Sequence, residues 1–525
     1  MSAPELATLP AAAPADVEAS HKFRWHLSDI ARQSSISLAG TVFTVVVGYA
    51  FRIYLARELG ARLLGWNALG MAVYAACKLA GETGLPAAAL RFTGVYSTRG
   101  DGRELSVFFW RGLFWTVAGT ASLCAAVVLS RNWIATRVFH DPGLRAYLPL
   151  YAALIPIGAG TTFLIQTLCG LKMVSRSTVI VKFASFPLMI GATAIALVFG
   201  FSLRGYVAAQ IAGECVTLAL AAWTLRRTLP IQLRWQDVTR QNLPNEVRWF
   251  AASMMGMGVL GFVGGHADRL ILGYFLSAKQ VGIYAIASSA AALNAIFLQS
   301  VNSIFGPTIA SLHDQGEHAL LLRLYQTLTK WILALTLPVV LTFLVFARTV
   351  MGVFGPDFQA GWLVLVIVTV GELINCATGS VGYLLIMSGN ERWLVRVRLV
   401  SAVVLTAANI LCIPKWGLAG VAIVSAAGTI LSNIVYLAIV RWRLRLFPYN
   451  RSYLKLLAPV LASAGFLWFV HEKIVSGWHA IPALVVAGSL AALVLLGGFI
   501  SIGLGEDDRL IVGMMKRRLS AALTG

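Results

Sequence analysis

Long apolar runs follow one another through this chain, and they constrain its fold more than any other feature. From Ser37 almost to the end, apolar stretches of 18 or more residues alternate with short polar segments. Each stretch is long enough to cross about 30 Å of hydrocarbon as a helix that satisfies its own backbone hydrogen bonds. Because the mean hydropathy is +0.77 and only 12% of the residues are charged, the sequence predicts an all-α integral membrane protein.

The apolar runs divide into fourteen predicted spans, and the shortest runs leave a range of twelve to fourteen. They are arranged as two lobes of six helices with two further helices near the end. The predicted parts are a disordered cytoplasmic tail (1–30), an N-lobe (31–226), a cytoplasmic connector (227–248), a C-lobe (249–445), two C-terminal helices (446–505) and a basic cytoplasmic tail (506–525). The first 30 residues lack the pattern of a removable signal peptide.

A sequence repeat relates the starts of the two lobes. Residues 265–285 align without a gap on residues 48–68, at an offset of 217 positions. Average residue usage predicts about two identities in such a window, whereas eight are found, and a duplicated architecture is therefore predicted. The identical pairs are Gly48/Gly265, Ala50/Ala267, Arg52/Arg269, Leu55/Leu272, Leu59/Leu276, Ala61/Ala278, Gly65/Gly282 and Ala68/Ala285.

The positions of the basic residues predict the orientation. With the N-terminus in the cytoplasm, 28 of the 42 Lys and Arg residues fall at inner ends, ten at outer ends and four inside spans. This bias is typical of a protein with both termini in the cytoplasm. The net charge of +20 also favours contact with anionic membrane lipids. Because the basic residues are spread over eight segments, a nucleic-acid partner is not predicted.

Arg52 and Arg269 are the most informative of the charges inside the spans. A charged side chain at the centre of a bilayer costs about 3 kcal/mol by insertion measurements, so it is expected to face a cavity, a partner or an interface. The repeat places the two arginines at equal depth in the two lobes. We predict that both face a central cleft, where guanidinium groups suit a phosphate. Alternatively, each pairs within its own lobe and only joins helices.

Five other charged or titratable residues are candidate site residues. Lys78 is a candidate substrate contact, and Glu82 lies four positions later on the same helix face. Glu82 belongs to the sequence GETGLP (81–86), which predicts a bent or broken helix. His266 precedes Arg269 by three positions and is a second candidate contact. Asp268 and Glu372 are candidates for ion coupling or charge pairing, and Glu372 shares a helix face with Asn375.

The sequence does not favour an enzyme. It contains no Gly-rich phosphate loop, no cluster of His and Cys with metal-ligand spacing, and no Ser–His–acid set in one compartment. The six cysteines all lie in apolar runs and are interpreted as core residues. We therefore expect no catalytic residues, no metal and no cofactor.

Several segments resemble polysaccharide-type flippases of the multidrug/oligosaccharidyl-lipid/polysaccharide exporter superfamily. The resemblance covers residues 40–445, and DRLILGYFLSAKQVGIYAIAS is its most specific part. Its segments are LARELGARLLGWNALG (55–70), DRLILGYFLSAKQVGIYAIAS (268–288), SLHDQGE (311–317) after Pro307, VFGPDFQAGWLVL (353–365) and IPKWGLAGVAIVSAAG (413–428).

This resemblance implies a MATE-like transporter of the bacterial cytoplasmic membrane with two six-helix bundles. Such a protein moves undecaprenyl-diphosphate-linked oligosaccharides, such as O-antigen, capsule or exopolysaccharide units, from the inner to the outer leaflet by alternating access. A polysaccharide polymerase and a chain-length regulator are partners that it makes plausible. The resemblance does not identify the sugar.

Three alternatives stay open. The tripeptide Ala267–Asp268–Arg269 also resembles lipid II flippases, but Lys78 and GETGLP stand where those proteins carry an Arg-rich segment. A cation-coupled small-molecule antiporter on the same fold would favour acidic cavities, which the intramembrane arginines oppose. A non-transporting scaffold of a polysaccharide assembly complex would tolerate the loss of every intramembrane charge.

Overall fold

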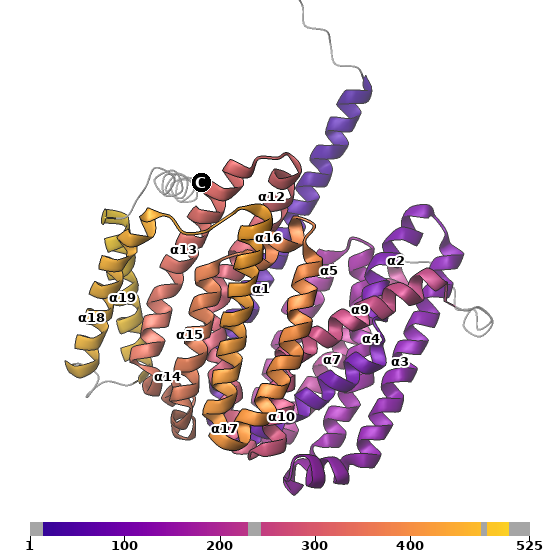
Figure 1. Ribbon diagram of the computed structural model, residues 1–525. Helices are drawn as coiled ribbons and strands as arrows, with labels where there is room; N and C mark the ends of the chain where they lie inside the picture. The colour runs from indigo at the N-terminus through magenta and orange to yellow at the C-terminus, as the bar shows by residue number, and fades with distance from the viewer. Residues whose placement is uncertain (1–13, 229–242, 474–479, 503–525) are drawn as a thin grey trace, which may run out of the picture. The chain divides into compact units, whose positions relative to one another are not determined.

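The computed structural model describes residues 14–228, 243–473 and 480–502, which are helical almost throughout (Figure 1). No β-strand occurs in these ranges. The first helices are α1 (Pro14–Glu82), α2 (Leu85–Arg99), α3 (Gly102–Trp133), α4 (Leu148–Gly170), α5 (Val174–Thr178), α6 (Phe186–Val198) and α7 (Ser202–Thr228). The later ones are α9 (Asn245–Gly265), α10 (Ala267–Phe275), α11 (Ala278–Ala291), α12 (Ile296–Asp314), α13 (His318–Val345), α14 (Ala347–Val353), α15 (Trp362–Thr378), α16 (Val381–Met387), α17 (Glu391–Leu444), α18 (Leu457–Lys473) and α19 (Ala480–Ile502).

Six short helical segments of 3-10 or π type connect or interrupt these helices. Two of them, η2 and η5, precede α4 and α15, which are the fourth helices of the two predicted lobes. The segments are η1 (Ile134–Val138), η2 (Pro142–Ala146), η3 (Val179–Ser185), η4 (Ala292–Ala295), η5 (Pro356–Gly361) and η6 (Arg451–Leu456).

Two elements, α1 and α17, each consist of two helices joined at a glycine. Gly60 has a φ of 72° and Gly417 a φ of 56°, a region that glycine enters without a steric penalty. Eleven helices in the described residues are long and apolar enough to cross a membrane. When the segments containing Gly60 and Gly417 are divided there, and the shorter apolar helix Val486–Ser501 is added, the segments coincide with the fourteen predicted spans. The all-α membrane fold is thus confirmed.

Local boundaries differ from the prediction in places. α1 begins at Pro14, within the stretch expected to be a disordered tail, because neither proline nor glycine interrupts residues 15–39. The bend expected at GETGLP is confirmed: Thr83 and Gly84 have positive φ values, and α1 and α2 meet there. Most of the predicted connector 227–248 and the whole tail 506–525 lie outside the described residues.

The chain forms two compact units that do not follow the order of the sequence. The first comprises residues up to Arg52, Ala80–Ser122 and Ala153–Met254. The second comprises Ile53–Leu79, Leu123–Ala152 and the chain from Met255 onwards. The second unit therefore contains two segments of the predicted N-lobe together with the C-lobe.

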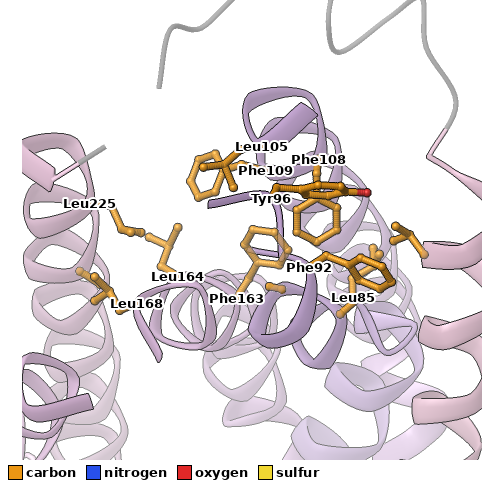
Figure 2. Close-up of a cluster of buried hydrophobic side chains, with 14 of the residues drawn as sticks. Leu85, Phe92, Tyr96, Leu105, Phe108, Phe109, Phe163, Leu164, Leu168 and Leu225 are labelled. Carbon is orange, nitrogen blue, oxygen red and sulfur yellow. The ribbon is translucent and has the colours of Figure 1, made fainter. Parts of the chain in front are cut away.

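An aromatic core holds the first unit together (Figure 2). Phe92 of α2 lies 6.1 Å from Phe108 of α3 and 5.7 Å from Phe250 of α9, measured between ring centroids. Phe163 of α4 packs against Phe108 and Phe109, and it is completely buried. Aromatic side chains contribute large buried areas and favour tilted or edge-to-face contacts. This cluster joins α2, α3 and α4 to α9, which is distant from them in the sequence.

In the second unit, α15 packs against α11, α13 and α17, and α18 packs against α19. Polar contacts fix these helices in register. The Tyr325 hydroxyl of α13 donates to the carbonyl of Thr378 at the end of α15, at 2.7 Å. The Thr378 hydroxyl lies 3.3 Å from the Asn433 side chain of α17. Buried polar groups of this kind are expected between membrane helices, which pack without a large hydrophobic driving force.

Candidate functional site

Arg52 lies on α1 among aromatic side chains of the first unit. Its guanidinium carbon is 5.5 Å from the ring centroid of Tyr49, one turn earlier on the helix. Tyr206 of α7 packs against Phe51 at 6.3 Å and is within electrostatic reach of Arg52. Arg52 itself is exposed. Both of these tyrosines carry no charge. The Arg52 guanidinium can therefore donate hydrogen bonds to an anionic ligand.

Arg269 lies near the start of a half-helix, because the first predicted span of the C-lobe, about residues 250–276, is interrupted. α9 ends at Gly265 and α10 begins at Ala267. Between them, His266 stacks on Phe262 with ring centroids 5.6 Å apart and rings nearly parallel. Broken helices in membrane proteins expose backbone groups at the break and are common at binding sites. The adjacent glycines Gly264 and Gly265 were the sequence signal for this break.

Asp268 is held by donors other than the Arg269 side chain. Its Oδ1 accepts a hydrogen bond of 2.8 Å from the backbone N–H of Arg269, and its Oδ2 accepts one of 2.7 Å from the hydroxyl of Tyr284 on α11. These neutral donors stabilise the carboxylate and fasten α10 to α11. The Nε of Arg269 is buried and has no hydrogen-bond partner within the described part of the chain.

Neither repeat-matched arginine forms an ion pair with a carboxylate among the described residues. The alternative in which each arginine pairs inside its own lobe therefore gains no support from the described contacts. Arg52 belongs to the first unit and Arg269 to the second, and their common anion site stays a prediction.

The remaining candidates occupy separate places. Lys78 lies over the ring of Tyr74, with Nζ 5.7 Å from the centroid. Glu82 is the last residue of α1, directly before the break at Thr83. Glu372 lies on α15, and its Oε2 accepts a 3.0 Å hydrogen bond from the Asn375 amide, as their shared helix face predicted.

A second group of residues, in the second unit, joins the two copies of the sequence repeat. Residues 55–70 pack against residues 272–285. We call this packing the outer-end contact, because the orientation predicted from the charge distribution would put these ends on the outer side. A Cβ atom added at Gly65 would overlap the carbonyl of Ala278, and one added at Gly282 would overlap the carbonyl of Ala61. All four of these residues are buried.

The outer-end contact is reciprocal. Gly65 and Gly282 are equivalent positions of the repeat, as are Ala61 and Ala278, so each Gly–Ala approach is the counterpart of the other. This pattern is what a two-fold relation produces, in which residue i meets residue j and j meets i. The spacing of Ala and Gly by four positions allows two helices to approach backbone to backbone.

Two further contacts link the repeat copies to segments before the fourth helices of the lobes. Arg57 of the first copy donates through Nε to the carbonyl of Val353, at 2.8 Å. Tyr274, which is 217 positions after Arg57, packs against His140 at 5.5 Å between ring centroids. Arg57 and Tyr274 are equivalent positions of the repeat, but their partners are not, and the two contacts differ in kind.

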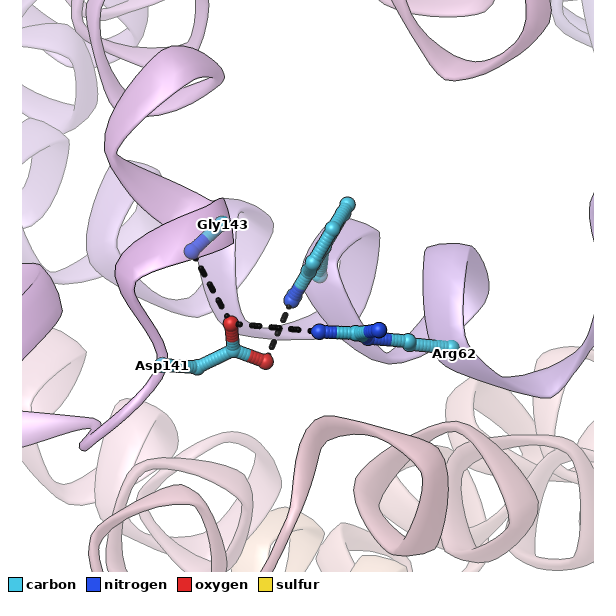
Figure 3. Close-up of polar contacts among 4 residues, drawn as sticks. Arg62, Asp141 and Gly143 are labelled. Carbon is cyan, nitrogen blue, oxygen red and sulfur yellow. Dashed lines mark hydrogen bonds and ion pairs between the residues drawn. The ribbon is translucent and has the colours of Figure 1, made fainter.

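Two ion pairs occupy matching places beside the outer-end contact. Arg62 approaches Asp141 at 3.7 Å, and its repeat equivalent Lys279 approaches Asp357 at 2.8 Å. Asp141 also accepts a hydrogen bond of 2.8 Å from the Trp66 indole and one of 3.0 Å from the Gly143 backbone N–H, and it lies between Gly143 and Arg62 (Figure 3). The anchored carboxylate fixes the connection before α4.

The aspartates of these pairs were missed in the sequence. Asp141 precedes its proline and Asp357 follows its own, so an alignment at a fixed offset does not match them. The Ala-x-x-x-Gly spacing, by contrast, was visible at 61–65 and 278–282 and was a signal for close helix packing.

A family comparison decides the wider assignment. The family described as polysaccharide biosynthesis protein matches residues 54–361, which is more than half of the chain. The chain belongs to this family. The match includes residues 61–65 and 278–282 of the outer-end contact and the connections that carry Asp141 and Asp357, whereas Arg52 lies just before it.

A curated relative supports the same grouping. The chain is 22% identical over 316 residues to the probable low-salt glycan biosynthesis flippase Agl15 of Haloferax volcanii. The aligned part is 60% of this chain and spans 60% of the length of that relative.

Two solved structures share the fold. Lipid II flippase MurJ in its inward closed conformation matches with a TM-score of 0.64 and 14% identity, over 88% of this chain and 98% of that one. A MATE family transporter of the MOP superfamily in an inward-facing conformation matches with a TM-score of 0.61 and 15% identity, over 79% and 97%. At this identity the likeness concerns the fold, and it confirms the MATE-like architecture predicted from the sequence.

Proposed function

We propose that this protein is a flippase that moves an undecaprenyl-diphosphate-linked oligosaccharide from the cytoplasmic to the outer leaflet of the bacterial cytoplasmic membrane. Membership of a polysaccharide biosynthesis family and the similarity to a relative named as a probable glycan biosynthesis flippase support this class of substrate. The observation that carries the mechanism is the reciprocal outer-end contact. In this contact each copy of the repeat supplies the same Ala and Gly positions, which suits alternating access between two pseudo-symmetric lobes.

The outer-end contact has the properties of a closure that opens reversibly. Its centre consists of small residues whose burial contributes little apolar area, and its flanking ion pairs are partly exposed. Arg62 has 66% of its side chain exposed, and Lys279 has 51%. Exposed ion pairs contribute about 0–1 kcal/mol each. The ion pairs at the edge of the contact therefore add little resistance to its separation.

Arg52 and Arg269 are the proposed contacts of the substrate diphosphate. Each is held without a carboxylate partner among the described residues, and a guanidinium binds phosphate oxygens through two parallel hydrogen bonds. Lys78 and His266 are additional proposed contacts. Asp268 serves in this proposal as a positioning residue, since its bond to Tyr284 fixes the start of the helix that carries Arg269.

Glu82 and Glu372 are the proposed sites of ion coupling. Both termini are placed in the cytoplasm, with lobes 31–226 and 249–445 rocking about the cleft. A polymerase and a chain-length regulator are the proposed partners, and the product enters O-antigen, capsule or exopolysaccharide biosynthesis.

One alternative substrate keeps a specific observation in its favour. The fold likeness to MurJ and the tripeptide Ala267–Asp268–Arg269 are compatible with lipid II as the lipid-linked substrate. The replacement of the Arg-rich segment by GETGLP opposes it. Purified protein in vesicles, offered lipid II and an undecaprenyl-diphosphate oligosaccharide in parallel, distinguishes the two substrates.

The arginine hypothesis is tested by transport and complementation. Arg52→Ala or Arg269→Ala should each remove a charge-assisted contact worth about 2–3 kcal/mol, or one to two decades of substrate affinity. Lysine at either position should restore part of the activity, because it keeps the charge and loses the planar fork. Vesicle translocation of a fluorescent lipid-linked oligosaccharide measures the loss, and complementation of a flippase-deficient strain confirms it.

Arg348→Ala is the matched control for this experiment. Arg348 is also an arginine near an aromatic ring, 5.0 Å from the Trp362 centroid, but it belongs to the predicted outer end. The Arg348→Ala variant should transport the substrate at the normal rate. Full complementation by both Arg52→Ala and Arg269→Ala at normal expression would show that the arginines are structural and would favour the scaffold.

A further inference from the structure

The two ends of the α17 hairpin bring tryptophans and arginines together in the second unit. Trp393 and Arg396 lie in the first arm of α17, and Trp442 and Arg443 lie in the last turn of the second arm. We call these four residues the Arg–Trp cluster. They are about 50 positions apart in the sequence and are adjacent only because the helix reverses at Gly417.

Ring contacts define the geometry of the Arg–Trp cluster. The indoles of Trp393 and Trp442 meet edge to face, with centroids 6.0 Å apart. Arg396 lies 5.0 Å from the Trp393 centroid. Arg443 lies 4.2 Å from the Trp442 centroid and 5.8 Å from that of Trp393. Two guanidinium groups from different arms therefore lie against a single indole, with both arginines exposed.

The charge around the cluster is strongly positive. Arg392, Arg398, Arg441 and Arg445 flank it, and Glu391 is the only acidic residue within 391–398 and 441–445. Arg392 lies in the first turn of α17, where the helix dipole disfavours a cation and favours an anion. Like charges gathered in this way repel each other, and a bound anion relieves the repulsion.

The surface next to the cluster is apolar. Leu399, Val400 and Val403 follow Arg396 along the first arm and are exposed by 53%, 62% and 65%. Trp442 is 64% exposed, and tryptophan is enriched at the level of lipid headgroups. A ligand that fits this surface has an anionic head and hydrocarbon chains. A free phosphate would use only the arginines.

We infer that the Arg–Trp cluster binds the headgroup of an anionic glycerophospholipid of the cytoplasmic leaflet, with Arg396 and Arg443 sharing the phosphate and the acyl chains lying along the first arm of α17. The charge distribution assigns this end of the hairpin to the cytoplasm. That leaflet is the anionic one, and basic pockets between helices there are suited to acidic headgroups. The inference is independent of the proposed transport substrate.

The test compares lipid binding to the purified full-length chain and to a double variant. Fluorescent phosphatidylglycerol and phosphatidylcholine are titrated at low and high salt. We expect Arg396→Gln/Arg443→Gln to weaken phosphatidylglycerol binding about 30-fold, from about fivefold for each arginine near a membrane surface. The conservative variant Arg396→Lys/Arg443→Lys should stay within about fivefold of the unaltered chain.

The chain contains a matched control. Arg226 and Arg227 end α7, also on the predicted inner side, and Arg227 lies 4.1 Å from the Trp223 centroid. Arg226→Gln/Arg227→Gln removes the same charge and one Arg–Trp contact, and it should leave phosphatidylglycerol binding within about twofold. Thermal unfolding without added lipid shows whether each variant is folded.

Three results would overturn the inference. Equal loss of binding in the α7 control and the α17 variant would show a diffuse charge effect without a site. Competition by undecaprenyl diphosphate that depends on Arg396 and Arg443, with no binding of phosphatidylglycerol, would assign the cluster to the transport substrate. Binding of inorganic diphosphate as tight as that of phosphatidylglycerol would exclude the role of the acyl chains.

Discussion

Gly65 is the position at which a single added methyl group tests the outer-end contact. Its Cβ would overlap the carbonyl carbon and oxygen of Ala278 and would lie 3.1 Å from the Ala278 Cα. Backbone atoms of a packed helix cannot rotate away as a side chain does, so the two helices must separate. Overpacking of this kind costs about 1–3 kcal/mol. Alanine returns about 0.5–1 kcal/mol through its better helix propensity.

This propensity gain is the same in the closed and open states, so only the overpacking, about 1–2 kcal/mol after the helices adjust, applies to the closed state alone. The ratio of closed to open molecules should fall about 5–30-fold. Gly282→Ala should give the same result, because its Cβ meets Ala61 in the equivalent way. Gly256→Ala is the control, since no atom lies within 4 Å of its added Cβ.

Cysteine cross-linking measures the closed fraction. Ala61→Cys and Ala278→Cys are introduced together after the six native cysteines have been replaced, and the initial rate of disulfide formation is followed. The rate should fall about 5–30-fold with Gly65→Ala or Gly282→Ala and stay unchanged with Gly256→Ala. In the parent, the completed disulfide should stop vesicle transport, and reduction should restore it.

The double variant distinguishes a shared closure from two separate defects. Once the two helices have moved apart to make room for the Cβ of one new alanine, the Cβ of the other alanine enters space that is already open. The effect of Gly65→Ala combined with Gly282→Ala should therefore be smaller than the sum of the single effects in kcal/mol. Fully additive effects, or normal cross-linking in both single variants, would refute the reciprocal contact. Normal transport by the cross-linked parent would refute rigid-body alternation.

Four further substitutions test polar side chains of the second unit. Tyr284→Phe should lower stability by about 1–3 kcal/mol, because Asp268 loses a buried donor, and an unchanged thermal unfolding temperature would contradict that role. Lys279→Ala and Asp357→Ala should each cost under about 1 kcal/mol, as expected for an exposed ion pair, with cross-linking at 61 and 278 changed less than about fivefold. Glu372→Gln should leave the protein folded and remove the dependence of vesicle transport on an ion gradient; a gradient dependence that persists would exclude Glu372 from coupling.

The spans and the repeat could be predicted because both depend on local properties of the sequence. A run of apolar residues specifies a membrane helix by length alone. The identities Ala61/Ala278 and Gly65/Gly282 then indicated which parts were duplicated. They did not indicate that the duplicated parts touch each other, since a repeat can be preserved by equal environments without any contact between the copies.

The interruptions of helices and the long-range pairs were harder to predict. Gly264 and Gly265 permit a break before His266, but glycine also occurs inside intact membrane helices, so its presence alone does not decide. Asp141 and Asp357 became recognisable only when their partners Arg62 and Lys279 were placed in space. Their surrounding loops differ in sequence, and the similarity lies in the contact.

The order of features along each repeat connects the proposed anion site with the closure. Arg52 precedes Ala61 by nine positions, and Arg269 precedes Ala278 by the same number, so each arginine and its half of the outer-end contact belong to one stretch of chain. A helix break lies between them in both cases, at Gly60 in the first copy and just before Ala278 in the second. A break at this place lets the closing segment keep its packing while the helix carrying the arginine changes direction. In the proposed mechanism, a phosphate that binds the arginine would therefore act on the helix before the break, and the segment after the break forms the outer-end contact.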